Sequence, residues 1–552
     1  MPPAPSRAPR ACGALGPYDR DRALRIASRL GCLPQPVHED KGSILLLDRE
    51  PIHWESGGKR GTGWIEGEVW RADRRLDDWE GAAEAGLTGL VAEGRKRYLH
   101  TSLNGLAPVY WMEEGGAIYF ASRIDPLVRT STRPLSIDWE AWAATLSLRY
   151  PLGERTPFAQ VRRLPNFATL RRRLGGRARP QTHTWPWTEV EPRTPVPAAA
   201  DRVVSELERN LATVEGDVLC PLSGGRDSRI LFVALAREGR IASAITTSDD
   251  EGDTHEEGFA GPVAAAFGIP HERLQPVAAD YAADWEERAR RVEYQFVDHA
   301  WLVPVARRVE GVSAPIPDGF GIDVFFCAGR HFYTEETLDT ANPQRAAQAL
   351  FGTLRRYGVG SRALTEDFRG PLESSAWSQF RAATARFEGH PSQPILSLYA
   401  TRSVRGVSTY STGLLGEGAT MLMPGVAAGV AGAALEVDPH EKLGGTLYDA
   451  VLEKLGPPAG MFPSTTDAPR RAPHLPRRWR SGPALEMYRR SLAEGPLAPH
   501  IAPDLRGWLD APAGVELAGD LRTGMEAVSM LHAWWRRYRD VLDEVDANDL
   551  LG

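Results

Sequence analysis

Residues 218–228 read Val-Leu-Cys-Pro-Leu-Ser-Gly-Gly-Arg-Asp-Ser, a pattern that predicts a short strand, a tight loop and the start of a helix. Ile230, Leu231 and Val233 continue the apolar pattern at helical spacing. A second apolar run, Ile241–Thr247, follows, so the segment reads as a βαβ unit with a right-handed crossover. We therefore expect an α/β fold with a parallel sheet, whose nucleotide sites lie at the carboxyl ends of the strands.

The loop has the residue types that bind an anion. Gly224 and Gly225 let backbone N–H groups approach a ligand without a Cβ in the way, and Ser223 and Ser228 can donate hydroxyl hydrogen bonds. Asp227 would repel a phosphate unless a divalent cation lay between them, which implies magnesium. No lysine follows the glycines, so the loop is not a Walker site. It suits a pyrophosphate that leaves. The alternative is an ordinary glycine turn capped by serine and aspartate.

The Ser-Gly-Gly-x-Asp-Ser pattern resembles the signature of the ATP pyrophosphatase family, whose members cleave ATP to AMP and pyrophosphate while adenylating a substrate. The resemblance implies ATP and Mg²⁺ as cofactors. It also implies a nucleotide site made by Leu222, Ser223, Gly224, Gly225, Asp227 and Ser228, with Thr246 and Thr247 beside the adenine.

A second motif, Pro-Asp-Gly-Phe-Gly-Ile-Asp at residues 317–323, predicts a tight loop that fixes the orientation of a carboxylate. Asp323 is our candidate for the second magnesium ligand, and an ordinary turn is the alternative. The motif resembles the Gly-x-Gly-x-Asp loop of asparagine synthetases, which touches the pyrophosphate side of ATP. That likeness places Gly319, Phe320 and Gly321 at the nucleotide, and makes Asp227 and Asp323 the metal-binding, catalytic carboxylates.

Length and composition indicate an ordinary globular protein of two or more domains. The chain has 552 residues, 42% of them hydrophobic, and a net charge of −7, so no global basic field points to nucleic acid. The four cysteines have no metal-ligand spacing and suggest no pair. Without an apolar run that spans a membrane or a signal-peptide core, we expect a cytoplasmic protein and no membrane partner.

The first part of the chain is predicted to be rich in strands. We expect strands at Ser43–Leu47 and residues 64–70, a hairpin pairing residues 108–111 with 117–121, and a helix over residues 136–148. The residues Asn104-Gly105, Pro108-Val109-Tyr110, Tyr119-Phe120-Ala121-Ser122, Ile137-Asp138 and Arg163-Leu164-Pro165 resemble the glutaminase half of class B asparagine synthetases. The resemblance implies an N-terminal-nucleophile αββα sandwich over residues 1–180.

The glutaminase chemistry is expected to be lost. The family needs Cys at position 2, where this chain has Pro2, and Cys12 is too far along to replace it. We expect a degenerate domain at 1–180, a proline-rich, extended and semi-rigid linker at 181–198, and an adenylating synthetase domain at 199–552. Within the last, we predict helices over residues 198–214 and 256–267 and a largely helical region over 330–460.

An acidic run, one histidine and a basic run each allow two interpretations. The acidic residues between 249 and 257 complement a helix dipole or bind a second metal. His299, beside Asp298 and Trp301, is packing or substrate wall rather than a base. The basic run is a solvated surface or a contact for phosphate or an acidic peptide. Its members are Arg470, Arg471, Arg477, Arg478 and Arg480.

At several positions this chain differs from the asparagine and β-lactam synthetases, which limits the subfamilies that it can resemble. Phe320 replaces the Glu of asparagine synthetases and the catalytic Tyr of β-lactam synthetases, Val324 replaces a Glu, and residues 462–467 contain no lysine where the family has one. The whole chain most resembles the lasso peptide cyclases, which close an isopeptide macrolactam.

This implies a leader-processed precursor peptide as substrate, with a leader-binding protein and a leader peptidase as partners. The alternatives are a β-lactam synthetase-like small-molecule cyclase, an ammonia-dependent asparagine synthetase-like enzyme and a non-catalytic peptide-binding scaffold.

Overall fold

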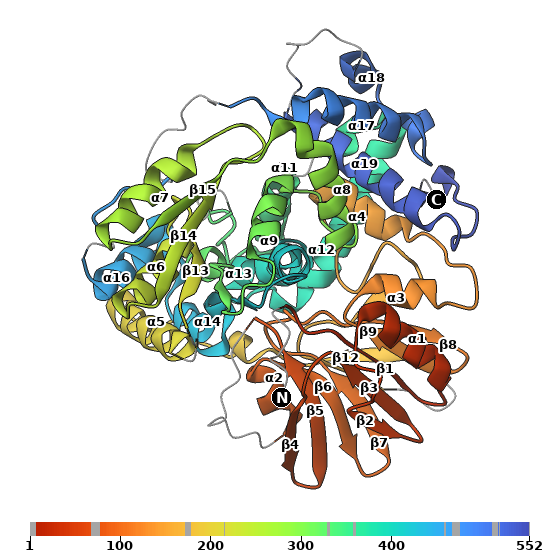
Figure 1. The fold of residues 1–552 in the computed structure, drawn as a ribbon, viewed down its shortest axis with the longest axis horizontal. Coiled ribbons are helices and arrows are strands. Elements are labelled where there is room, and N and C mark those ends of the chain that lie inside the picture. Colours follow the sequence, from red (N-terminus) through yellow and green to blue (C-terminus); the bar gives the residue numbers. More distant parts are fainter. Residues whose placement is uncertain are drawn as a thin grey trace.

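The computed structural model has strands of two kinds, antiparallel in the first part of the chain and parallel in the second (Figure 1). It describes residues 7–67, 78–171, 178–212, 214, 216–327, 332–356, 360–457, 460–465, 475–509, 517 and 519–550. The protein is thus of the mixed α/β class that the sequence predicts.

Two six-stranded antiparallel sheets make up the first part of the chain. The first has the order β10-β8-β9-β1-β3-β2, with β1 (Ala11–Leu15), β2 (His38–Asp40), β3 (Ser43–Leu47), β8 (Tyr110–Glu114), β9 (Ala117–Ala121) and β10 (Arg162–Arg163). The second has the order β12-β11-β7-β6-β5-β4, with β4 (Ile52–Ser56), β5 (Lys59–Ile65), β6 (Leu87–Glu93), β7 (Lys96–His100), β11 (Ala168–Arg171) and β12 (Arg179–Thr182).

The strand predictions for this part are confirmed at one strand and one hairpin, and one strand is wrong in position. Strand β3 has the predicted bounds, and β8 and β9 form the predicted hairpin across Gly115 and Gly116, both with positive φ. The strand predicted over 64–70 is wrong in position, because β5 runs from Lys59 to Ile65 in register with β6; residues 68–70 lie outside the described residues.

The period-2 alternation of apolar side chains builds the layers. In β3, Leu45 and Leu47 face the apolar core between the two sheets, whereas Ile44 and Leu46 face the core on the outer side of the first sheet. Helices α1 (Arg20–Leu30) and α3 (Ile124–Arg129) cover that outer side, and α2 (Trp79–Glu84) covers the second sheet. The layers therefore run helix, sheet, sheet, helix.

A parallel sheet begins at residue 218, as predicted. Strands β13 (Val218–Pro221), β14 (Ile241–Thr247) and β15 (His271–Leu274) are joined by α6 (Asp227–Arg237) and α7 (His255–Ala266). Strand β16 (Ile316–Pro317) lies against β13 and pairs with β17 (Met421–Leu422). The carboxyl ends of β13, β14 and β16 therefore meet at one edge, where the two sequence motifs follow β13 and β16.

Helices form most of the remaining structure. Their bounds are α4 (Trp139–Leu148), α5 (Val196–Leu211), α8 (Tyr281–Arg291), α9 (Val303–Val309), α10 (Ile322–Phe325), α11 (Pro343–Arg356), α12 (Glu366–Thr384), α13 (Gln393–Leu398), α14 (Ala428–Leu435), α15 (Pro439–Lys442), α16 (Thr446–Leu455), α17 (Gly482–Ala493), α18 (Pro503–Leu509) and α19 (Gly519–Tyr538). Two π-helical segments, Tyr399–Val407 and Tyr410–Leu415, continue α13.

The predicted linker packs into the core. Its Trp185 and Trp187 are each 2% exposed, and their rings contact those of Tyr399 and Phe325. Strand β12 extends to Thr182 and α5 begins at Val196, so the connection is shorter than predicted. One apolar core contains Trp54 as well as Val218, and α19 returns to α4 through the pair Trp142–Trp534. The domain boundary at residue 180 stays a prediction.

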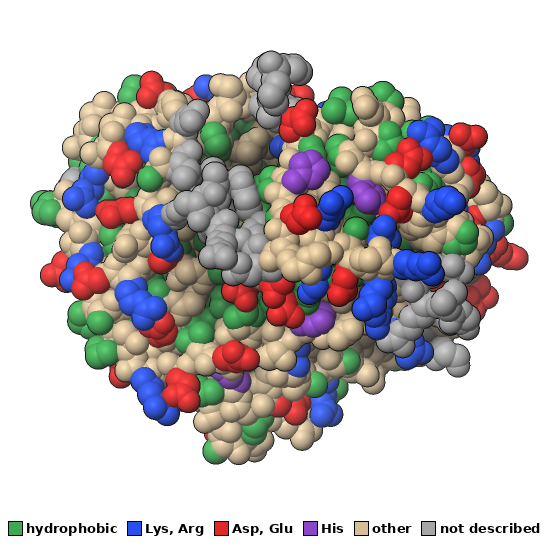
Figure 2. Space-filling view, turned by 90° about the horizontal axis from the view of Figure 1, so that it is seen from below, with side chains coloured by type: hydrophobic (Ala, Val, Ile, Leu, Met, Phe, Trp, Pro, Cys, Tyr) green, Lys and Arg blue, Asp and Glu red, His purple; other side chains and the backbone are tan. Residues whose placement is uncertain are grey.

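The surface matches the modest net charge. On the face in Figure 2, Lys, Arg, Asp and Glu side chains are interspersed, and no broad patch of one sign is visible there. Among the described residues, no helix combines the length and apolarity that crossing a membrane requires.

Candidate active site

The Ser-Gly-Gly loop closes on itself between β13 and α6. The Ser223 N–H donates to Oγ of Ser228 at 2.9 Å, and the two hydroxyl oxygens are also 2.9 Å apart. The Gly225 N–H donates to Oγ of Ser223 at 3.2 Å. Since α6 begins at Asp227, its unpaired N–H groups and positive dipole end lie at this loop.

Two distant segments hold Gly224 in place. Its N–H donates to Oε2 of Glu256, on the first turn of α7, at 2.5 Å, and its carbonyl accepts the Thr465 N–H at 3.0 Å. A Cβ at residue 224 would lie 2.5 Å from Cγ2 of Thr465 and 2.8 Å from Cβ of Phe259. Position 224 therefore needs glycine for close packing. Glu256 supports the loop, and it also lies at the N-terminus of α7, where it complements the helix dipole.

Arg229 connects the loop to residues 462–465. It is 2% exposed, and it donates to the carbonyls of Phe462 at 2.6 Å and Pro463 at 2.9 Å. Residues 462–465, which contain no lysine, thus return to the loop. Residues 466 and 467 lie outside the described residues.

The two predicted motifs meet at the start of α6. A Cβ on Gly319 would lie 2.7 Å from Cβ of Asp227 and 3.0 Å from the backbone N of Ser228. Burial first, and then the negative charges of Asp323 and Asp318, raise the pKa of Asp227 to about 8. The hydroxyl of Tyr448, from α16, donates to Oδ1 of Asp227. The structure thus gathers three carboxylates where the sequence predicts two.

This carboxylate cluster fits magnesium. Aspartate oxygens are the donors that Mg²⁺ prefers, and the unbalanced charge around Asp227 is what a divalent cation would neutralise. In the described part of the chain, no group of three or more His, Cys, Asp or Glu side chains is placed to hold a metal ion by itself. Asp227 and Asp323 would therefore supply part of the coordination, and phosphate oxygens and water the rest.

A cavity of about 830 Å³ opens above the loop. Its lining includes Leu222, Ser223, Ser228, Thr246, Thr247, Gly319 and Phe320, all predicted site residues. Five other predicted site residues do not line it: Gly224, Gly225, Asp227, Gly321 and Asp323. The Thr246 hydroxyl donates to the carbonyl of Leu222 at 2.5 Å and lies 2.7 Å from Nε2 of His271, so it faces the protein.

Aromatic side chains form the opposite wall of this cavity. The ring centroid of His299 lies 4.8 Å from that of Tyr410 and 5.1 Å from that of Trp301, and Phe320 completes the wall. Burial lowers the pKa of His299 to about 4, so the imidazole is neutral near pH 7. These contacts agree with the packing or wall interpretation of His299.

The sequence did not indicate several site residues. Tyr448 and Ser411, whose hydroxyl donates to Oδ2 of Asp318 at 2.5 Å, are contributed by distant helices without a local motif. The interpretation of Arg478 as solvated or ligand-binding is wrong, because it is 2% exposed and pairs with Asp250 at 2.7 Å and with Asp284. Arg470 and Arg471 lie outside the described residues.

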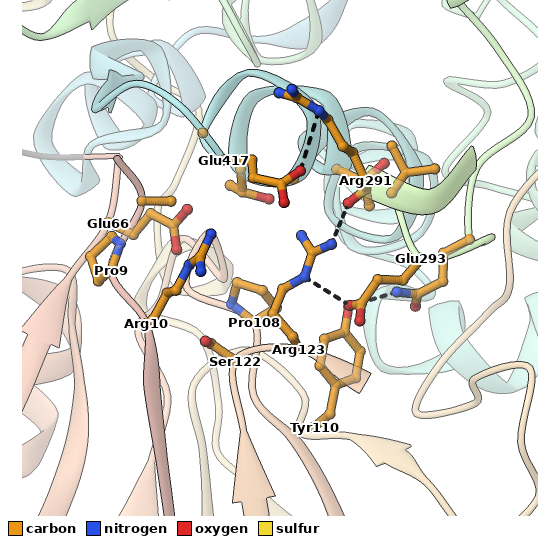
Figure 3. Close-up of a pocket in the computed structure, with 17 residues that line it drawn as sticks. Pro9, Arg10, Glu66, Pro108, Tyr110, Ser122, Arg123, Arg291, Glu293 and Glu417 are labelled. Atoms are coloured by element: carbon orange, nitrogen blue, oxygen red, sulfur yellow. Dashed lines mark hydrogen bonds and ion pairs between the residues drawn. The ribbon is translucent and has the colours of Figure 1, made fainter. Parts of the chain in front are cut away.

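A second, smaller cavity of about 50 Å³ lies where the first strand meets the π-helical segments (Figure 3). Arg123 donates to the Arg291 carbonyl at 2.7 Å and pairs with Glu293 at 3.5 Å, joining the two parts of the chain. Glu66 is 7% exposed and forms no hydrogen bond or ion pair within the described ranges; burial raises its pKa to about 8. This cavity holds charged groups but no predicted site residue.

Comparison with known proteins identifies no family for this chain. Neither a protein-family model nor a curated protein sequence matches the chain. One solved structure similar to it is the glutamine phosphoribosylpyrophosphate amidotransferase of B. subtilis in complex with ADP and GMP. The likeness covers 57% of this chain and 77% of that one at 12% identity, and its TM-score of 0.22 carries no argument.

Proposed function

We propose that this protein is an ATP-dependent carbon–nitrogen ligase that closes a macrolactam within a ribosomally made peptide. The observation that carries the proposal is the contact of the Gly319 loop with the start of α6. It sets Asp227, Asp318 and Asp323 beside the Ser-Gly-Gly loop at the carboxyl edge of a parallel sheet. A helix N-terminus, serine hydroxyls and acidic metal ligands together suit a nucleoside triphosphate.

The reaction has two steps. A side-chain carboxylate of the peptide forms a bond to the α-phosphorus of ATP, and the bond to pyrophosphate breaks. The peptide's N-terminal amine then attacks the acyl carbon, AMP leaves with the electron pair, and the amine loses a proton. Bound magnesium would supply neutralisation of phosphate charge.

The residues of the chain have separate roles in this scheme. The N-terminus of α6 and the hydroxyls of Ser223 and Ser228 would hold the departing phosphates, and Asp227 and Asp323 would hold the cation. Phe320 and the neutral ring of His299 exclude water from the adenylate. Phe320 transfers no proton, so a phosphate oxygen or solvent accepts the proton of the amine.

The size of the cavity supports a substrate larger than the nucleotide. At about 830 Å³, it lies near the upper end of the usual range for small-molecule sites. Its apolar side, formed by Leu302, Val305 and Leu415 beside Tyr410, can hold peptide side chains. Holding amine and adenylate together makes the second step intramolecular, with an effective molarity of ~10⁵ M or more for a well-oriented pair. In the cytoplasm, a leader-binding protein and a leader peptidase would deliver the peptide.

The test is pyrophosphate exchange into ATP. We expect exchange that requires magnesium and a leader-free peptide with an acidic side chain, and that disappears when this residue is changed to its amide. Exchange with β-amino acids instead would indicate a small-molecule cyclase, and exchange with aspartate an asparagine synthetase-like enzyme. ATP binding without exchange for any of them would indicate a scaffold.

A further inference from the structure

A third cavity, of about 600 Å³, lies where α12 and the π-helical segment Tyr399–Val407 meet the residues around β10. Five arginines line it together with two glutamates, Glu140 and Glu154. We call this cavity the arginine cleft; its arginines are Arg155, Arg162, Arg163, Arg386 and Arg405. It shares no lining residue with the cavity above the Ser-Gly-Gly loop.

Two of these arginines have their charge balanced. Arg155 pairs with Asp138 at 2.9 Å and with Glu140, and Arg162 lies 3.6 Å from the same Asp138 carboxylate. These pairs account for the acidic side chains nearest the cleft except Glu154, whose pKa burial raises.

The other three arginines form no ion pair within the described ranges. Arg163 is 3% exposed and donates only to the carbonyls of Val404 and Gly105, both at 3.0 Å. Arg386, at the exposed mouth, places its guanidinium 4.1 Å from the ring centroid of Trp185. Three positive charges thus surround the cleft, against the single carboxyl of Glu154.

Arg405 is the most exceptional of the three. It is 3% exposed, and its Nη2 donates to the Arg155 carbonyl at 2.5 Å. Its Nε and Nη1 have no acceptor among the residues that the structure describes. Burial and the nearby charge of Arg163 lower its pKa to about 9. A buried cation with unpaired N–H groups is costly, and removing it is often stabilising, so its presence calls for an anionic partner.

We propose that the arginine cleft binds an oxyanion of the phosphate type, held by Arg163, Arg386 and Arg405. A guanidinium donates several hydrogen bonds in one plane and stays weakly hydrated, which suits phosphate oxygens. Two sources share this chemistry: free pyrophosphate or phosphate, and the phosphate chain of a nucleotide. The proposal does not depend on the proposed ligase activity, because it rests on another cavity.

The test measures binding of inorganic pyrophosphate and, separately, of ATP by calorimetry, with chelator present to remove magnesium. We expect one site for at least one of the two ligands, and Arg405→Met and Arg386→Met each to weaken it by about tenfold or more. Arg381→Met, on the exposed side of α12, is the matched control and should change nothing. Binding of pyrophosphate indicates a free anion, and binding of ATP alone indicates a nucleotide.

A second readout separates ligand binding from a structural role. Without anion, Arg405→Met should melt at the same temperature as the parent protein or higher, since it removes an unbalanced buried charge, and pyrophosphate should no longer raise its melting temperature. Should Arg405→Met fail to fold, Arg386→Met at the mouth carries the test alone.

Two results would overturn the proposal. One is affinity unchanged in both arginine variants but lost in Ser228→Ala, which would place the anion at the Ser-Gly-Gly loop. The other is binding no tighter than that of sulfate or acetate, which would mean an adventitious ion only.

Discussion

The hydroxyl of Tyr448 donates a hydrogen bond to the carboxylate of Asp227, across 221 residues of sequence. Tyr448 is fully buried, and its ring packs against Phe326 at 5.0 Å between centroids. This bond fixes one oxygen of Asp227 at the point where α6 begins. Helix α16 therefore takes part in positioning the predicted metal ligand.

Tyr448→Phe tests that link. Because the ring keeps its packing, only the hydroxyl is lost, and we expect a loss of ~1–2 kcal/mol in the free energy of unfolding. We also expect about tenfold slower AMP formation. The matched control is Tyr399→Phe, which removes another buried hydroxyl, bonded to the Asn104 carbonyl at 2.6 Å, away from the carboxylates. It should cost similar stability at unchanged turnover, and equal turnover in both variants would contradict a positioning role.

Asp227→Asn should separate stability from activity. At pH 9, above the pKa of about 8, the substitution removes one of three clustered negative charges, so thermal unfolding of the nucleotide-free protein should move to higher temperature there by several degrees. AMP formation should fall by at least ~10³-fold, because a metal ligand is lost. A variant that melts lower than the parent and keeps its activity would show that Asp227 is an ordinary structural residue.

Gly319→Ala tests the contact between the two motifs. The new Cβ would meet backbone and Cβ atoms of Asp227 at 2.7–3.0 Å, so one of the two loops must shift, with a cost of ~1–3 kcal/mol. Nucleotide binding should weaken with it. Gly352→Ala on α11, where nothing lies within 4 Å of the new Cβ, should be neutral or stabilising by ~0.5–1 kcal/mol. Unchanged ATP binding in Gly319→Ala would mean that the loops do not share a ligand.

Glu66→Gln should change how stability depends on pH. The pKa of Glu66 is about 8 in the folded protein and near 4.5 in the unfolded chain, so unfolding releases a proton between these values. Stability from this group is therefore greatest at low pH and falls as pH rises through that window. Glu66→Gln should melt higher than the parent at pH 8.5, by up to ~4 kcal/mol in unfolding free energy, and by little at pH 5. A difference independent of pH would contradict a neutral Glu66.

The local parts of the site could be predicted from sequence, and its tertiary parts could not. Ser223 to Asp227 and Gly319 to Asp323 are contiguous motifs whose glycines and carboxylates indicate their chemistry directly. Tyr448, Ser411 and Arg229 show no such signal, because their partners lie 93 to 234 residues away in the chain. Arg478 shows no such signal either, because a run of arginines is typical of a solvated surface and its buried partners Asp250 and Asp284 lie far away in the chain.

For the fold too, the local elements could be predicted from sequence and the tertiary packing could not. Period-2 alternation predicted β3, and the βαβ pattern predicted β13, α6 and β14. The proline-rich connection was expected to be extended because proline and polar residues usually avoid the core. Trp185 and Trp187 instead fill space beside Tyr399, a consequence of packing between elements far apart in sequence.

The most direct test of the central claim is one incubation of the purified protein with ATP, magnesium and a leader-free peptide of the proposed substrate class, followed for peptide mass and for AMP. The account predicts that the peptide loses one water for each AMP formed, and that Asp227→Ala abolishes both changes. ATP binding with neither AMP nor dehydrated peptide, when the leader-binding protein is also present, would contradict it.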